Sequence, residues 1–210
     1  MKFSEFSMRN ILGAAIGYGA IFTITYVGAS SIIRGNESLE AGTLGSPLAM
    51  VSSSRSQSFE EEVAVLSSRL KKAYGVDERR ARNFAGWILE AEAYNPKIPA
   101  DVIASMIMTE SSFKYSARSK AGAVGPAQVK PQYWASLCGN LNNPRSNILC
   151  GAQVLSRYRA QAGSLKAAIK MYNVGPSNYN NGSMKEATDR YVGKIAKHLA
   201  MLDNPGVVIR

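Results

Sequence analysis

Residues 99–110 read PADVIASMIMTE, and the interpretation of the whole sequence starts from this stretch. Pro99 suits a first helical position, because its fixed φ angle fits the helix and its missing N–H is not needed there. The apolar residues that follow recur at helical spacing: Val102, Ile103, Met106 and Ile107. Glu110 lies one turn after Met106 and Ile107, so the pattern predicts a helix with a carboxylate at the edge of its buried face.

Two features of this predicted helix bear on the chemistry of Glu110. Its position near the helix C-terminus sets the carboxylate against the negative end of the helix dipole. Partial burial disfavours the charged form as well, so both effects raise a carboxyl pKa. A carboxyl group held protonated near neutral pH can serve as a general acid. On spacing alone, the pattern favours an ordinary glutamate at a helix end.

A glycine-containing loop follows, and residues 119–128 read SKAGAVGPAQ. Closely spaced glycines allow a tight turn and a close approach of the backbone to a ligand. Ser119 and Gln128 offer neutral hydrogen-bonding groups, which suit a carbohydrate better than a phosphate. A purely structural turn is the alternative.

Five ordered segments together resemble one known family. They are ESSF at 110–113, SKAGAVGPAQ at 119–128, NPRSNILCGA at 143–152, AIKMYNVGP at 168–176 and EATDRYV at 186–192. They are similar to the motifs of the lytic transglycosylase (SLT) domain, which has a goose-lysozyme-like fold. Two departures stand out: the family's G-L-M-Q reads GPAQ at 125–128, and the last segment has one inserted residue. The GPAQ departure places smaller side chains where the expected cleft has its wall, so it bears on the shape of that wall.

The resemblance implies a mainly α, lysozyme-like domain that cleaves the MurNAc–GlcNAc β-1,4 bond of peptidoglycan and leaves 1,6-anhydro-MurNAc ends. Glu110 would be the single catalytic acid and base, with no cofactor and no metal. The substrate-binding residues implied are Ser119, Gln128, Tyr172, Asn173 and Tyr191, the last with its hydroxyl against the Glu110 carboxyl. Asp101, Glu90 and Glu92 are not obvious nucleophiles. A hydrolytic lysozyme on the same fold, or a non-catalytic wall-docking subunit of a membrane assembly, are the alternatives.

The N-terminal third has a different character. Residues 11–33 carry no charge and lie between Lys2 and Arg9 on one side and Arg34 on the other. This pattern predicts a transmembrane anchor over 1–34 with the remainder exported, although residues 27–29 (VGA) also resemble a signal-peptide cleavage site. Residues 35–58 are rich in Gly and Ser and predict a flexible linker. The catalytic domain is then expected over 59–205, with a first helix from Phe59 and a second from about Asp77 to Ala93.

Charge and cysteine content narrow the partners. With 25 Lys and Arg against 15 Asp and Glu, the net charge of +10 favours an anionic partner. No basic run with aromatic interleaving supports nucleic-acid binding, whereas the carboxylates of peptidoglycan fit the charge. The one histidine, His198, is expected on the surface of a late helix. Cys138 and Cys150 could form a disulfide after export or remain two buried thiols.

These observations indicate a domain tethered to a membrane through residues 11–33, acting on peptidoglycan glycan strands. The catalytic domain would lie in the periplasm, or the chain would be a membrane component of a phage virion. A protein secreted after signal cleavage is the alternative. The expected assembly is a virion or a secretion complex, for which the enzyme would open the cell wall locally.

Overall fold

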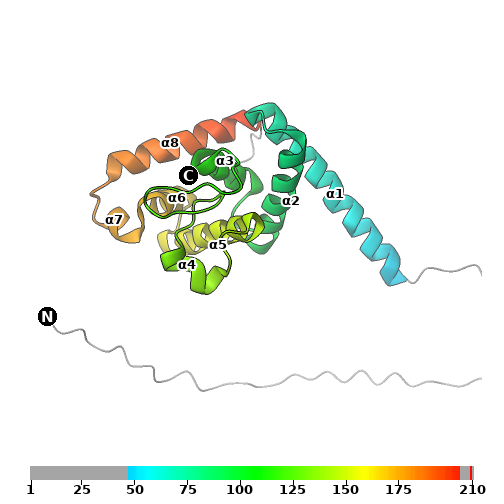
Figure 1. Cartoon of the computed structure of the whole chain (residues 1–210), viewed down its shortest axis with the longest axis horizontal. Helices are drawn as coiled ribbons and strands as arrows, with labels where there is room; N and C mark the ends of the chain where they lie inside the picture. Colours follow the sequence, from blue (N-terminus) through cyan, green and yellow to red (C-terminus); the bar gives the residue numbers. More distant parts are fainter. Residues whose placement is uncertain (1–46, 204–208, 210) are drawn as a thin grey trace, which may run out of the picture. The chain divides into compact units, whose positions relative to one another are not determined.

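The computed structural model describes residues 47–203 and residue 209, with side chains from Gln57 onward. The described helices, shown in Figure 1, are α1 Pro47–Tyr74, α2 Glu78–Tyr94, α3 Ala100–Ser111, α4 Pro131–Cys138, α5 Pro144–Ala162, α6 Leu165–Val174, α7 Pro176–Asn180 and α8 Lys185–Met201. Extended pairing among these residues is limited to isolated bridges from Val124 to Arg118 and to Val129. The described part of the chain is mainly α, as the sequence predicts.

The first helix is longer than the sequence indicates. α1 begins at Pro47 and not at Phe59, so the second half of the predicted linker is helical. Pro47 is acceptable in a first turn, and serine lowers helix propensity only modestly. Once Val63, Leu66 and Leu70 anchor the helix in the core, each further turn toward the N-terminus adds hydrogen bonds without a new nucleation cost.

The second helix follows its sequence signals closely. The Asp77 side chain accepts a hydrogen bond from the backbone N–H of Arg80 at 3.0 Å, which caps the first turn of α2. Phe84 and Ile88 are fully buried on the inner face. Asn95 forms the C-cap, in front of Pro96, and the helix ends there as predicted.

α3 lies at the centre of the domain (Figure 1), where it packs between α2 and α8. The apolar residues of the predicted stripe are fully or almost fully buried, but so are Asp101, Ala104 and Ser105 on the other faces. The helix is therefore enclosed on all sides over these turns, which its amphipathic pattern does not predict. Asp101 is accommodated because its carboxylate forms an ion pair with Arg69 at 2.8 Å.

The predicted membrane span at residues 11–33 lies outside the described residues. Among the helices that the structure does describe, none combines the length and the apolar character needed to cross a membrane.

Candidate active site

Glu110 occupies the last turn of α3, where its side chain is half-buried. The helix stops immediately afterwards, because Ser112 and Phe113 both adopt left-handed backbone conformations with φ of 51° and 60°. Such angles cost non-glycine residues about 1–2 kcal/mol each, so surrounding structure has to hold them. The fully buried Phe113 ring does so by packing against Phe84 and Tyr74. The position of Glu110 is therefore fixed by the core directly behind it.

Tyr191 on α8 donates a hydrogen bond from its hydroxyl to Oε1 of Glu110. The Tyr191 side chain is almost fully buried, so this bond forms in a poorly solvated environment. Burial raises the pKa of Glu110 from 4.5 to about 7, and the bond from Tyr191 opposes part of that rise. Burial also raises the pKa of Tyr191, and the Glu110 charge adds to the effect, so the tyrosine stays a proton donor.

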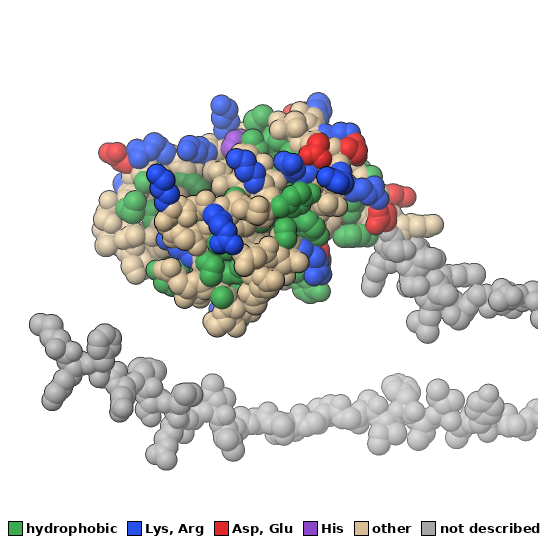
Figure 2. All heavy atoms as spheres, in the orientation of Figure 1, with side chains coloured by type: hydrophobic (Ala, Val, Ile, Leu, Met, Phe, Trp, Pro, Cys, Tyr) green, Lys and Arg blue, Asp and Glu red, His purple; other side chains and the backbone are tan. Residues whose placement is uncertain are grey.

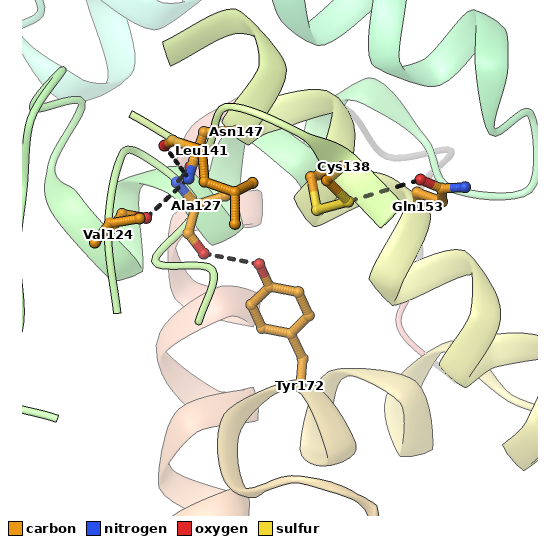
Figure 3. The surroundings of a disulfide bond; sticks show 8 residues. Val124, Ala127, Cys138, Leu141, Asn147, Gln153 and Tyr172 are labelled. Atoms are coloured by element: carbon orange, nitrogen blue, oxygen red, sulfur yellow. Dashed lines mark hydrogen bonds between the residues drawn. A yellow bond between two sulfur atoms is a disulfide. The ribbon is translucent and has the colours of Figure 1, made fainter. Parts of the chain in front are cut away.

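Tyr172 on α6 is the second tyrosine near Glu110. Its hydroxyl donates to the Ala127 carbonyl oxygen at 2.7 Å (Figure 3), and burial followed by the Glu110 charge raises its pKa. Gly151 on α5 leaves room for this arrangement, because a Cβ there would lie 2.7 Å from the Ala127 Cβ and 3.0 Å from the Tyr172 hydroxyl. Ala127 therefore packs closely against Gly151 of α5, and a larger side chain at position 127 would not fit in the same way.

Two of the predicted substrate-binding side chains form bonds within their own loop. Gln128 has a φ of 50°, and its side-chain amide donates to the carbonyl oxygens of Gly125 at 2.9 Å and Ala117 at 3.2 Å. The Ser119 hydroxyl accepts from the backbone N–H of Ala123 at 3.0 Å. Both side chains therefore shape the loop between α3 and α4. Asn173 on α6 is exposed to solvent.

Asn147 is a structural residue of the site that the sequence reasoning did not single out. It is fully buried on α5 and holds the loop by three hydrogen bonds (Figure 3). Its Oδ1 accepts from the Ala127 N–H at 2.8 Å, and its Nδ2 donates to the carbonyl oxygens of Val124 at 2.8 Å and Leu141 at 3.1 Å. The signal was present in the 143–152 segment, where an asparagine stands among apolar residues of a helix.

The two cysteines form a disulfide, with their Cα atoms 5.6 Å apart (Figure 3). Cys138 ends α4 and Cys150 lies within α5. α4 has no buried residue, so the disulfide and the edge-to-face contact of Trp134 with Tyr158 attach it to the domain. In the structure neither of the two cysteines is a free thiol.

Polar contacts tie α8 to α3 beyond the Tyr191–Glu110 bond. His198 Nδ1 lies 3.0 Å from the hydroxyl of Thr109, the neighbour of Glu110. That hydroxyl also donates to the Ser105 carbonyl oxygen, and Tyr74 donates to the His198 carbonyl oxygen at 2.8 Å. His198 is therefore half-buried and bonded to Thr109 on α3, whereas the sequence analysis placed it on the open surface of a late helix. Burial lowers its pKa.

The other carboxylates considered from sequence have different partners. Asp101 lies at the opposite end of α3, paired with Arg69. Glu90 forms an ion pair with Arg145, and Oε1 of Glu92 accepts from the backbone N–H of Ala100 at 2.8 Å. A groove between α1, α2 and the start of α3 is lined by Asp101 and Glu92, but not by Glu110. Among the described residues, no cluster of His, Cys, Asp and Glu could hold a metal ion.

The segment that carries Glu110 and Tyr191 is similar to known proteins. Residues 88–191 match the family model described as Transglycosylase SLT domain, and both Glu110 and Tyr191 fall inside the match. The match supports the SLT transglycosylase domain family for this helical segment. Over 110 residues the chain is 32% identical to the protein named Transglycosylase of Enterobacteria phage PRD1. That alignment covers 51% of this chain and 40% of the phage protein, so the chain spans less than half of the relative's length.

Proposed function

We propose that the domain is a peptidoglycan lytic transglycosylase with Glu110 as its catalytic residue. The observation that carries the proposal is the half-buried Glu110 carboxyl with a pKa of about 7, bonded by Tyr191 inside the segment that matches the SLT domain. A group with a pKa near the working pH can give up a proton and take one back with little cost in either direction.

The reaction that fits this site uses one carboxyl group twice. Protonated Glu110 donates its proton to the glycosidic oxygen between N-acetylmuramic acid and N-acetylglucosamine, and the C1–oxygen bond breaks. The resulting Glu110 carboxylate then removes the proton of the muramyl 6-hydroxyl, whose oxygen bonds to C1 of the same sugar. The product is a 1,6-anhydro end, and the carboxyl returns to its starting state. The Tyr191 hydroxyl steadies the carboxylate in the intermediate stage, because a hydrogen bond to the charged form favours it.

The surroundings of the other carboxylates support this non-hydrolytic route. Glycosidases that hydrolyse through paired carboxyl groups place the two about 5–10 Å apart across the bond that breaks. Asp101, Glu90 and Glu92 are each engaged with other groups of the protein, as described above. None of these three carboxylates is therefore free to act as the base that activates a water molecule or as the nucleophile that hydrolysis requires.

The test compares the wild-type chain with Glu110→Gln on purified peptidoglycan sacculi, with Glu61→Gln on exposed α1 as the matched control. We expect Glu110→Gln to lose activity by about 10³-fold or more, since it removes the proton donor, and Glu61→Gln to keep it. Mass spectrometry of the products distinguishes the chemistries. Anhydro-muramyl ends support the lyase, reducing ends show a lysozyme, and full activity of Glu110→Gln refutes the site.

We propose further that the domain acts from a membrane tether at residues 11–33, with the catalytic domain outside the cytoplasm, and opens the wall locally. The likeness to a phage transglycosylase favours phage entry over a secretion machine as the setting. Fractionation of the producing cells and of purified virions tests this. The chain is expected in a membrane fraction of one of them, and removal of residues 1–34 is expected to release it. A wild-type chain that remains in the soluble fraction contradicts the tether.

A further inference from the structure

The acidic and basic residues of the domain are strongly segregated along the chain. From Ser111 to Lys185 the sequence contains ten Lys or Arg residues and no Asp or Glu. This segment comprises the loop after Glu110 and the whole of α4, α5, α6 and α7. We call its surface the acid-free surface. The acids of the described residues lie instead on α1, α2, α3, α8 and their connections.

Ion pairs neutralise only a minority of these positive charges. Within the described residues, Arg145 pairs with Glu90, and Lys170 and Lys185 both pair with Asp189. The other seven have no carboxylate partner there, and Lys114, Lys120 and Lys130 among them are exposed. Uncompensated charges on one surface add to a common positive potential, which attracts anions over about a Debye length of 8 Å in physiological salt.

Exposed basic residues follow both Glu110 and its partner Tyr191 along the chain. Lys114, Arg118 and Lys120 lie in the loop that follows Glu110 directly, all exposed. On α8, the exposed Lys194 and Lys197 follow Tyr191. Figure 2 shows Lys and Arg side chains spread across one face of the domain, whereas Asp and Glu side chains lie toward its two ends.

We infer that the acid-free surface binds the anionic part of the substrate, namely glycan strands whose stem peptides carry free carboxylates. This rests on the proposed function and narrows its substrate class. A neutral polysaccharide would gain nothing from seven unpaired cations on this surface, whereas a strand with a carboxylate on each stem would be attracted along its length. The domain therefore distinguishes peptidoglycan with free stem carboxylates from peptidoglycan in which those carboxylates are amidated.

The test measures binding separately from cleavage. Full-length protein in the Glu110→Gln background is sedimented with sacculi, either native or with carboxylates converted to amides by carbodiimide and ammonia. The surface variant is Lys114→Gln/Lys120→Gln/Lys130→Gln. The matched control is Lys72→Gln/Arg79→Gln/Lys97→Gln, which removes three exposed charges outside the acid-free surface.

We expect the surface variant to bind native sacculi about five- to tenfold more weakly near physiological salt, and the control to change less than about twofold. Amidated sacculi should bind the unsubstituted protein about as weakly as native sacculi bind the surface variant. Equal binding to native and amidated sacculi overturns the inference, as does an equal loss in both triple variants.

Two further outcomes are decisive. Tighter binding to phosphatidylglycerol vesicles than to native sacculi would identify a lipid surface as the partner and overturn the inference. Charge-dependent binding to sacculi without any cleavage products from the wild-type chain would sink the proposed function while the anionic surface stands. If the wild-type chain releases anhydro products but binds native and amidated sacculi equally, the proposed function stands and the inference about the acid-free surface is overturned.

Discussion

Replacing Glu110 by glutamine should make the folded domain more stable at neutral and alkaline pH. The folded-state pKa of Glu110 is about 7, against an ordinary value of 4.5. Below pH 4.5 the carboxyl is protonated in both states. Between pH 4.5 and 7 the unfolded chain loses this proton while the folded domain retains it, so stability falls as the pH rises, and the loss is complete above pH 7.

The size of this effect follows from the pKa difference. At about 1.4 kcal/mol per pKa unit, the shift corresponds to up to about 3 kcal/mol of stability lost above pH 7. Glutamine is nearly isosteric with the protonated acid and does not ionise, so Glu110→Gln avoids that loss. For a domain of this size, the melting temperature at pH 8 should rise by roughly 6–12 °C.

The assay is denaturant unfolding of wild-type, Glu110→Gln and Glu61→Gln chains at pH 4, 6 and 8. The stabilisation by Glu110→Gln should be near zero at pH 4 and grow steadily toward pH 8, while the exposed Glu61→Gln control shows no such trend. The reasoning is refuted if the two glutamine variants behave alike, or if the Glu110→Gln difference is the same at every pH.

Three more perturbations have definite expected outcomes. Tyr191→Phe removes the bond that lowers the Glu110 pKa, so the alkaline fall of kcat/KM should move up by about one pH unit, which a pH–rate profile would show. In a urea titration, Gly125→Ala should destabilise the domain by about 3 kcal/mol or more, because the φ of Gly125 is 73° and a Cβ there would lie 2.4 Å from Asn147. Gly122→Ala is the control, because Gly122 also has a positive φ, of 80°, but faces open space, so it should cost only about 1 kcal/mol. Replacing both cysteines by serine should lower stability by about 2–4 kcal/mol and expose α4 to limited proteolysis, whereas an unchanged digestion pattern would show that α4 does not depend on the disulfide.

Local signals specified the individual helices well. The Asp77 cap of α2 acts through the backbone within a few residues, so the sequence alone locates it. Pro99, expected at the first helical position, lies one residue earlier, as the N-cap of α3. The sequence analysis did not predict that α1 begins at Pro47, because the serine-rich residues before Phe59 have low helix propensity when they are considered alone. A helix that is already anchored in the core extends through such residues without a new nucleation cost.

The candidate site divides in the same way. The ordered motifs around Glu110 singled out the residue, and the resemblance they carry named Tyr191 as its neighbour, but only the packing of α8 on α3 brings together two side chains that are 81 positions apart. The same packing buries His198 between helices, and the approach of α5 to the loop makes Asn147 its anchor. Sequence determined where α2 and α3 form and which carboxyl to examine, since capping and periodicity are local. Tertiary structure decided the pKa of that carboxyl and the segregation of charge in space, because desolvation and electrostatic potential depend on every neighbour that the fold assembles.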